Sequence, residues 1–410
     1  MNKPKIRFKG FNDDWEQRKL GELGSVSMCR RIFKEQTSER GDIPFYKIGT
    51  FGAVADAFIS KELFEEYKLK YPYPKKGDIL ISASGSIGRT VEFTGKNEYF
   101  QDSNIVWLNH DERLSNTFLK CFYSVVKWTG IEGSTIKRLY NDNILNTVIN
   151  LPSIHEQNKI GAYFAKIDNL ITLHQRKCDE IKKLKKYMLQ NIFPQDGEKV
   201  PKIRFGGFND DWEQRKLGDV IPIITDYVAA GSFADIAKHV NYKSKPSYAQ
   251  LVRTIDLKHN FKSNDSIYVD KEAFEYLYRV NLNVESIVLP NIGANIGEVY
   301  YIDPSKFPFP RNVLGPNAIY LIPNENIKFI YSFFQTKEFQ KEIFVNVASS
   351  GQPKFNKTEL KRITISLPKS KEQKCIGLYF QYLDNLITLH QQKCDQLKNM
   401  KKFMLQNMFV

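Results

Sequence analysis

The stretch PKIRFKGFNDDWEQRKLG covers residues 4–21 and returns at residues 201–218 as PKIRFGGFNDDWEQRKLG. The two copies differ only where Lys9 is replaced by Gly206. So long a repeat within one chain indicates an internal duplication. Because each copy carries far more sequence than a solenoid repeat, we expect two similar halves and not a stack of small units.

We call each copy of this stretch a box. One further matching segment follows each box later in the chain. LPSIHEQNKIGAYF (151–164) runs into FAKIDNLITLHQRKCDEIKKLKKYMLQNIF (164–193), and LPKSKEQKCIGLYF (367–380) runs into FQYLDNLITLHQQKCDQLKNMKKFMLQNMF (380–409). The order is therefore box, divergent block and long segment, twice over. Two similar frames around two different blocks indicate two different tasks of one kind. The polar, turn-prone PQDGEKVP (194–201) links the copies.

The long repeated segments are predicted to be helices. Their apolar and seam positions recur at alternating spacings of three and four, which is a heptad pattern. Thirty residues form a helix of about 45 Å at roughly 1.5 Å per residue. One such stripe cannot bury itself, so the two helices are expected to pack on each other, and twofold symmetry within one chain favours an antiparallel pair. The residues expected to pack are Ile167, Ile171, His174, Cys178, Ile181, Met188, Leu383, Ile387, His390, Cys394, Leu397 and Met404.

His174 with Cys178, and His390 with Cys394, are spaced four residues apart and so share a helix face. Two such pairs meeting in an antiparallel packing would offer a His₂Cys₂ zinc site. The alternative is that they are polar seam positions that fix the helix register and were copied by duplication. We assign no metal ligand, and the metal content of the purified protein distinguishes the two interpretations.

The fold class expected is α+β. Two mixed α/β domains in a pseudo-twofold arrangement are joined by two long antiparallel coiled-coil helices. The expected segments are a first domain at residues 1–150, a helical spacer and linker at 151–200, a second domain at 201–366 and a C-terminal helix at 367–410.

Composition limits the class of protein. The chain has 410 residues, enough for two domains, and its net charge of +14 suggests a polyanionic partner such as nucleic acid. There is no apolar run of about eighteen residues, and MNKPKIRFKGF lacks the apolar core of a signal peptide. Five scattered cysteines favour a reducing cytoplasm.

The divergent blocks contain strand-like runs with a glycine turn. YFQDSNIVWL (99–108) is expected to form a further strand, and IKFIYSFFQTKEFQKEIF (327–344) is expected to form a helix. GDILISASGSIGRTVEF (77–93) corresponds to SIVLPNIGANIGEVYYI (286–302), and neither turn fits a phosphate-binding motif. Later in each block, GSTIKRLYNDNIL (133–145) and SSGQPKFNKTEL (349–360) are small, polar and basic, which suits contact with phosphates or base edges. An ordinary surface loop is the alternative.

The candidate DNA contacts come from these turns and loops and from nearby basic or amide side chains. In the first block they are Arg30, Arg31, Ser84, Ser86, Arg89, Ser134, Thr135, Lys137 and Arg138. In the second block they are Asn291, Asn295, Arg311, Asn312, Ser350, Gln352, Lys354 and Lys357.

No catalytic constellation is present in the sequence. It has no Asn/Asp-Pro-Pro-Tyr/Phe box for adenine methylation, no Walker sequence, no cofactor loop and no His-Glu-x-x-His zinc helix. We therefore expect a chain without catalytic residues that binds no cofactor of its own.

The DDWEQRKLG boxes, the GDILISASGSIG turn and the paired LPSIHEQNKIGAYFAKIDNLITLHQRK and LPKSKEQKCIGLYFQYLDNLITLHQQK segments resemble the specificity (S) subunit of type I restriction-modification enzymes. The resemblance covers essentially the whole chain. It implies two target-recognition domains, each of which reads half of a split sequence in double-stranded DNA. It also implies that the helices fix the spacing of the halves and dock two modification (methyltransferase) subunits, which restriction subunits join. S-adenosylmethionine, ATP and Mg would belong to those partners, in the cytoplasm of a bacterium or archaeon.

The second block differs from the first in and around its glycine turn. The second turn reads NIGANIG where the first reads SASGSIG, and SKFPFPRNVLGPN (305–317) is proline-rich, so the role of a single residue in one block cannot be assigned to a residue of the other.

Two other functional classes remain as alternatives. One alternative is a self-sufficient methyltransferase or nuclease with unrecognised residues. The other is a coiled-coil adaptor or scaffold that binds RNA or DNA without a restriction role. Stronger affinity for structured RNA than for duplex DNA would favour the adaptor.

Overall fold

The protein forms two compact units, each built from parts of both repeats. Unit 1 comprises Met1–Gln175 and Gln391–Val410, and unit 2 comprises Arg176–His390. Each unit thus includes the end of the helix that belongs to the other repeat, which a division into consecutive segments does not anticipate. The expected boundaries after residues 150, 200 and 366 stay a prediction. The computed structural model describes residues 3–131, 137–195, 197–262, 265–345 and 354–409.

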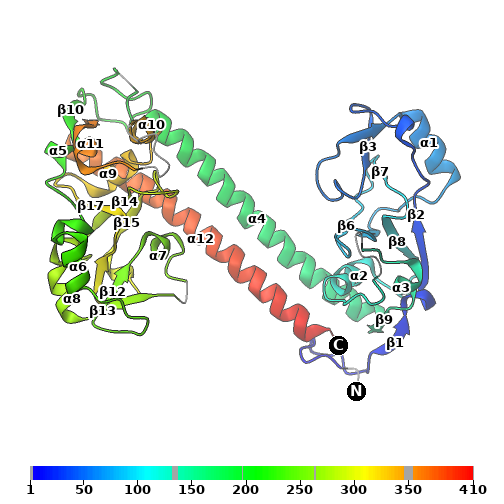
Figure 1. Cartoon of the computed structure of the whole chain (residues 1–410). Coiled ribbons are helices and arrows are strands. Elements are labelled where there is room, and N and C mark those ends of the chain that lie inside the picture. Colours follow the sequence, from blue (N-terminus) through cyan, green and yellow to red (C-terminus); the bar gives the residue numbers. More distant parts are fainter. Residues whose placement is uncertain (1–2, 132–136, 196, 263–264, 346–353, 410) are drawn as a thin grey trace. The chain divides into compact units, whose positions relative to one another are not determined.

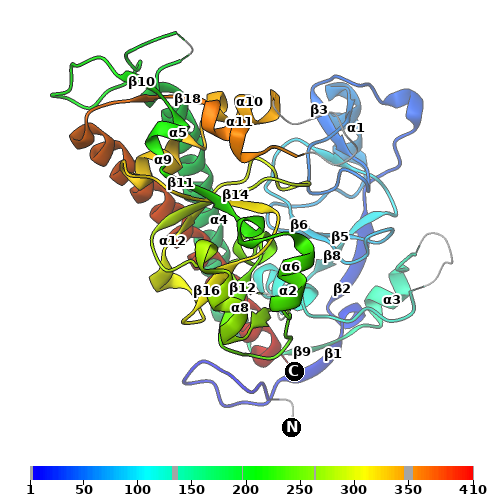
Figure 2. The same ribbon diagram turned by 60° about the vertical axis from the view of Figure 1, so that its left-hand side comes forward.

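Unit 1 contains a two-stranded ribbon, β1-β9, and two sheets, ordered β2-β8-β5-β6 and β4-β3-β7. Figure 2 shows the strands of the larger sheet side by side, and α1 lies beside β3 in both views (Figures 1 and 2). The elements are β1 (Glu16–Lys19), β2 (Gly24–Met28), β3 (Ile43–Tyr46), β4 (Ala57–Ile59), α1 (Lys61–Lys70), β5 (Ile79–Ser82), β6 (Thr90–Glu92), β7 (Tyr99–Phe100), β8 (Ile105–His110), α2 (Asn116–Tyr123), α3 (Asn141–Leu145), β9 (Val148–Leu151), the first part of α4 (Ile154–Ile192) and the last part of α12 (Ser370–Met408).

Unit 2 repeats this topology, with a ribbon β10-β18 and sheets β11-β17-β14-β15 and β13-β12-β16. The α+β class with two repeated mixed domains is therefore confirmed, and their pseudo-twofold placement stays a prediction. The elements are β10 (Glu213–Lys216), α5 (Leu217–Val220), β11 (Ile223–Asp226), α6 (Phe233–His239), β12 (Ala249–Val252), α7 (Thr254–Lys258), β13 (Ile267–Val269), α8 (Lys271–Tyr276), β14 (Ser286–Pro290), β15 (Tyr300–Ile302), β16 (Asn312–Leu314), β17 (Ala318–Ile322), α9 (Ile327–Phe333), α10 (Lys337–Val345), α11 (Lys357–Arg362) and β18 (Thr364–Leu367).

The glycine turns join central and edge strands as expected. Every residue of β5 and of β14 is buried, which matches their largely apolar sequences, and each pairs antiparallel with the strand after its turn. Two expectations are wrong. The strand expected over residues 99–108 divides into β7 and β8, which belong to different sheets. The helix expected over 327–344 breaks into α9 and α10, because the Thr336 hydroxyl caps α10 by accepting a hydrogen bond from the Phe339 amide at 3.3 Å.

The repeated boxes form the same local structure in both units. Glu16 pairs with Leu151 in β1-β9, and Glu213 pairs with Leu367 in β10-β18, in an identical antiparallel register. Trp15 precedes the first ribbon and is 3% exposed, and its repeat partner Trp212 is 2% exposed. Both tryptophans are thus structural anchors and not base readers.

A buried ion pair ties each box to the start of a long helix. The Arg7 guanidinium donates two hydrogen bonds of 2.7 Å to the Glu156 carboxylate at the start of α4. Arg204 makes the corresponding pair with Glu372 at the start of α12, with both distances 2.8 Å. The hydrogen bonds to the carboxylates raise the pKa of both arginines. The glutamate side chains are almost fully buried, so each pair is a bidentate contact that excludes water.

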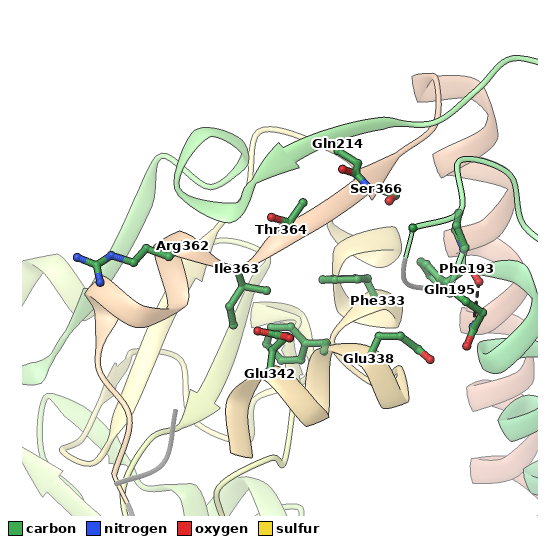
Figure 3. A pocket seen from close by; sticks show the side chains of 13 residues that line it. Phe193, Gln195, Gln214, Phe333, Glu338, Glu342, Arg362, Ile363, Thr364 and Ser366 are labelled. Atoms are coloured by element: carbon green, nitrogen blue, oxygen red, sulfur yellow. Dashed lines mark hydrogen bonds between the residues drawn. The ribbon is translucent and has the colours of Figure 1, made fainter. Parts of the chain in front are cut away.

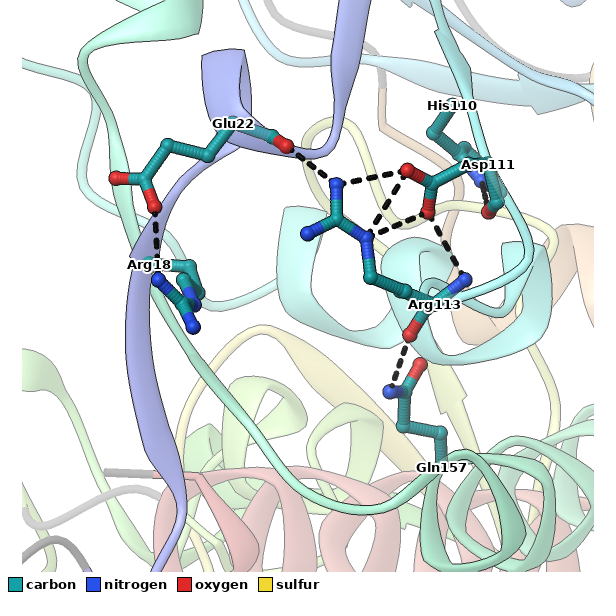
Figure 4. A network of polar contacts seen from close by, with 6 residues as sticks. All are labelled: Arg18, Glu22, His110, Asp111, Arg113 and Gln157. Atoms are coloured by element: carbon teal, nitrogen blue, oxygen red, sulfur yellow. Dashed lines mark hydrogen bonds and ion pairs between the residues drawn. The ribbon is translucent and has the colours of Figure 1, made fainter.

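A second polar network joins the box of unit 1 to β8 and α4 (Figure 4). Arg113 donates to the carbonyl oxygen of Glu22, the residue directly after the box, at 2.6 Å and to both carboxylate oxygens of Asp111. This guanidinium holds the pKa of the Asp111 carboxyl below its usual range. The Gln157 amide donates to the Arg113 carbonyl oxygen at 2.9 Å, so the start of α4 is fixed against the end of the sheet.

The two long helices pack antiparallel within each unit. In unit 1, Asp168 of α4 pairs with Lys401 of α12 at 2.6 Å, and the Cys394 thiol donates to the Ile171 carbonyl oxygen at 3.6 Å. Residue numbers rise along one helix as they fall along the other.

Unit 2 has the repeat-equivalent contacts. Lys185 pairs with Asp384 at 2.5 Å, and the Cys178 thiol donates to the Ile387 carbonyl oxygen at 3.9 Å. The expected antiparallel direction is therefore found in both units.

All the residues that were expected to pack between the two helices are buried or half-buried. Ile167, Cys178, Leu383, Cys394 and Leu397 are buried, and the half-buried members are Ile171, His174, Ile181, Met188, Ile387, His390 and Met404. Among the described residues, no group of three or more His, Cys, Asp or Glu side chains could hold a metal ion, so the zinc interpretation gains no support. Among the described helices, none combines the length and apolarity needed to cross a membrane.

Candidate nucleic-acid interface

One edge of the four-stranded sheet in unit 1 gathers loops that are distant in the sequence. Met28 at the end of β2 pairs with Val106, and Ser82 at the end of β5 pairs with Ile105, so both strands end where β8 begins. The loops at residues 29–33, 83–89 and 101–104 therefore lie at the same edge.

The basic loop after α2 joins this edge. Ser84 and Arg138 form an isolated β-bridge, and the Gly85 amide donates to the Lys137 carbonyl oxygen at 3.2 Å. Lys137 and Arg138 are exposed. The glycine turn and the basic loop, predicted separately as candidates, are thus side by side.

The arginines of this edge are held by neighbours. The Arg30 guanidinium lies over the Tyr71 ring, 5.2 Å from its centroid, and the Arg31 Nε donates to the Asp102 carboxylate at 2.7 Å. Both arginine side chains remain exposed. Because a partly fixed guanidinium loses less conformational freedom on binding, these two side chains are suited to phosphate or guanine contact.

The turn itself is internally hydrogen-bonded. Ser84 is buried and donates to the Asn104 side chain at 2.7 Å, whereas Ser86 is exposed and its carbonyl oxygen accepts from the Ser82 hydroxyl. Arg89 is exposed and donates to the Phe51 carbonyl oxygen. Ser84 therefore supports the turn, while Ser86 and Arg89 lie at its surface.

Gly88 shows why the turn needs glycine. Its φ of +84° lies in the left-handed region, and an added Cβ would sit 2.9 Å from Nε1 of Trp128. In unit 2, the φ of the corresponding Gly297 is +91°, and the Gln340 side chain donates to its carbonyl oxygen at 2.8 Å. In both units a side chain from the segment after the α2 or α9 helix therefore closes over the end of the turn.

The equivalent edge of unit 2 pairs the same two loops. Ile292 and Lys354 form an isolated β-bridge, and the buried Asn291 side chain donates to the Phe355 carbonyl oxygen at 3.2 Å. Asn291 therefore holds the turn against the loop. Lys354 is exposed at this edge.

At this second edge, lysine side chains are paired with carboxylates of nearby residues. Asn295 accepts a hydrogen bond of 2.9 Å from Lys258, which also pairs with Glu298 at 2.5 Å. Lys357 pairs with Asp226 at 2.8 Å. The two edges therefore share a backbone plan and present different side chains.

Two of the predicted residues lie elsewhere. Arg311 and Asn312 are at the start of β16 in the three-stranded sheet, not at the edge formed by β11, β14 and β17. Arg311 lies over the Tyr248 ring at 4.4 Å, and the buried Asn312 donates to the Phe309 carbonyl oxygen at 2.7 Å. The structure does not bring them together with the turn and the basic loop.

Sequence reasoning missed several residues of these edges: Tyr71, Asp102, Trp128 and Lys258. Each is recognised only through a contact with a residue far along the chain, and no local motif marks it. Ser134, Thr135, Ser350 and Gln352 lie outside the described residues, and every candidate DNA contact stays a prediction.

A cavity of about 240 Å³ lies in unit 2 between the β10-β18 ribbon, α10 and the end of α4 (Figure 3). Phe193, Phe333 and the carboxylates of Glu338 and Glu342 line it, and Arg362 points away from it. Its acidic and aromatic lining does not suit a phosphate ligand.

Comparison with known proteins identifies relatives. A family model described as "Type I restriction modification DNA specificity domain" matches residues 12–183 and 209–399, once in each repeat. A putative type I restriction enzyme specificity subunit of Haemophilus influenzae is 60% identical over 152 residues, which are 37% of this chain and 40% of that protein. The matched part is thus less than half of that relative.

Two further relatives match over most of the chain. The MjaVIII type I restriction enzyme specificity subunit of Methanocaldococcus jannaschii is 25% identical over 342 residues, covering 80% of this chain and 74% of that one. The crystal structure of a type I restriction-modification system S subunit from M. genitalium has a TM-score of 0.64 and 17% identity, and covers 100% of this chain and 99% of its own. At this identity, the structural likeness shows the fold alone.

Proposed function

Because this chain belongs to the family of type I restriction-modification DNA specificity domains, we propose that it reads a split sequence in duplex DNA, one half through each unit. The observation that carries this proposal is the pair of equivalent sheet edges. They share one topology and one pairing of glycine turn with basic loop, but differ in side chains.

The difference between the edges is what two unlike half-sites require. The first edge presents Arg30, Arg31 and Arg89, a residue type that pairs with guanine through two hydrogen bonds. The second edge presents Asn295, whose amide type suits adenine, together with Lys354. The repeated frame cannot distinguish two half-sites, so specificity rests on the divergent blocks.

The repeated helices are proposed to fix the spacing and to dock two copies of one methyltransferase. Each repeat keeps an exposed aliphatic and aromatic pair three residues apart: Leu184 with Tyr187 on α4, and Met400 with Phe403 on α12. The aromatic members are 55% exposed in both copies. Large apolar side chains that stay exposed in both copies mark an interaction surface, and side chains three apart share a helix face.

Chemistry is assigned to the partners. The chain lacks the motifs of a methyltransferase or an ATPase, so S-adenosylmethionine, ATP and Mg are proposed to bind to the modification and restriction subunits. Its own role is non-catalytic, namely to bring those subunits to the target adenines.

The proposed function predicts a pattern of DNA methylation. In a host that makes this chain with its modification subunit, a genome-wide map of N6-methyladenine should show a split motif with a fixed gap, absent without the chain. Replacing residues 219–366 by the block of another family member should change one half of the motif and leave the other intact. A continuous motif, or none with assembled and active partners, would contradict the proposal and favour the adaptor alternative.

The docking surface predicts a change in stoichiometry. Leu184→Asp with Tyr187→Asp should reduce the bound methyltransferase from two copies to one, since the loss of an aromatic anchor costs about 2 kcal/mol or more, roughly thirtyfold in affinity. Native mass spectrometry measures the copy number. The control Leu184→Met with Tyr187→Phe reproduces the pair of the other repeat and should retain both copies. Two copies bound to the Asp variant would refute this surface.

A further inference from the structure

Unit 1 has a basic groove beside the helices, separate from the sheet edge. It has a volume of about 1010 Å³ and lies between the segment after α2, the first part of α4 and the last part of α12, elements that come together in Figure 1. Its lining includes Lys127, Lys398, Lys401, Lys402 and Asp168.

Most of the positive charge in this groove is available. Lys401 is paired with Asp168 at 2.6 Å. Lys127, Lys398 and Lys402 are exposed and, within the described part of the chain, take part in no ion pair. Leu405 and Phe409 also line the groove. Such apolar surface supports the aliphatic stems of lysines while their ammonium groups stay in water.

The groove adjoins the candidate DNA edge at one point. Lys127 lines the groove, and the next residue, Trp128, lies against Gly88 of the glycine turn. Tyr123 at the end of α2 contacts the Trp128 ring at 5.5 Å, which fixes this short connection. A polyanion bound along the turn, Arg89 and the basic loop therefore meets the groove lysines next.

We propose that this groove binds the phosphate backbone of the duplex outside the half-site that unit 1 reads. The inference rests on the proposed function, since it takes duplex DNA as the ligand. Lysine ammonium groups neutralise phosphates without reading bases, so the groove adds affinity and fixes the register of the duplex without changing the recognised sequence.

In the described residues of the second unit, the charge beside the equivalent helix positions is balanced. Lys182 and Lys186 are the repeat partners of Lys398 and Lys402 and are also exposed. The segment after α9, however, is helix α10, in which Lys337 and Lys341 each stand directly before a glutamate, Glu338 and Glu342, so that the helix has no net charge. The phosphate contact is therefore a property of unit 1, and the pair in unit 2 is a control on equivalent helix positions.

The test is the salt dependence of DNA affinity for the full chain assembled with its modification subunits. Binding to a duplex containing the methylated motif is measured from about 50 to 200 mM salt for the wild type and for the triple variant Lys127→Gln, Lys398→Gln, Lys402→Gln. The slope of log affinity against log salt should fall in magnitude by about 0.9 for each phosphate that the variant no longer neutralises, so by about two to three in all. The methylated motif should not change, and Lys182→Gln with Lys186→Gln should leave the slope unaltered.

Three results would overturn the inference. An unaltered slope in the triple variant means that the groove lysines meet no phosphate. An equal fall in the control pair means that the effect belongs to the helices in general. Loss of a methyltransferase copy with unaltered DNA affinity means that the groove holds an acidic protein segment. A wild-type complex that binds no duplex refutes the proposed function itself, which separates the two failures.

Discussion

Glu156→Gln is expected to lower the free energy of unfolding of unit 1 by about 3 kcal/mol, because it removes one partner of a buried ion pair and leaves the Arg7 charge uncompensated. The side chains of Glu156 and Arg7 are only 1% and 13% exposed, so water cannot replace the missing carboxylate. Hydrogen exchange measured by mass spectrometry resolves the units, and the amides of β1 and β9 should lose protection. Peptides of β10 and β18 should not change.

Two variants control for this interpretation. Glu66→Gln removes the exposed partner of Lys70 in the same unit and should change protection little, since water screens such pairs. Arg7→Met with Glu156→Leu removes both charges and should recover most of the stability. If the single variant is as protected as wild type, the box is held by its aromatic anchor and not by the ion pair.

Much of the frame could be predicted from the sequence because its signals are local. The heptad seam predicted the long helices, and strand-like, largely apolar runs before glycine turns predicted β5 and β14. The break at Thr336 was missed because an apolar pattern continues across it, and only the hydroxyl cap separates α9 from α10.

Pairings between distant residues could not be predicted. Nothing near Arg31 indicates that Asp102 will hold its guanidinium, and nothing near Gly88 indicates Trp128. The same limit explains why the end of α12 was not assigned to unit 1. A heptad seam predicts that a helix packs on a partner helix. It does not predict which other segments of the chain pack against the end of that helix.

Residues 1–195 alone are expected to form a homodimer. Unit 1 is normally completed by the end of α12, where Phe409 lies 6.2 Å from Trp15 and Lys401 pairs with Asp168. Removing that segment would expose the apolar surface around Trp15. The half-chain still carries an equivalent helix end, because α4 ends in the repeat partners of Phe409 and Lys401.

These repeat-equivalent residues, Phe193 and Lys185, make the corresponding contacts in unit 2. Phe193 lies 6.1 Å from Trp212, and Lys185 pairs with Asp384. One straight helix cannot pack on its own start, so the end of α4 can complete only a second copy of the half-chain. Each copy then offers its helix end to the other and buries both exposed surfaces.

Light scattering should therefore give twice the mass of the half-chain, and Phe193→Asp should yield a monomer or aggregates by placing a carboxylate in the aromatic site. Assembled with the modification subunit, the dimer should methylate a split motif whose two halves are identical and inverted, because both readers are copies of unit 1. A well-folded monomeric half-chain would contradict the exchange of helix ends. A dimer that methylates the original asymmetric motif would contradict the assignment of one half-site to each unit. Light scattering therefore tests whether a helix end from a second copy completes each unit. The methylated motif tests which half-site each unit reads.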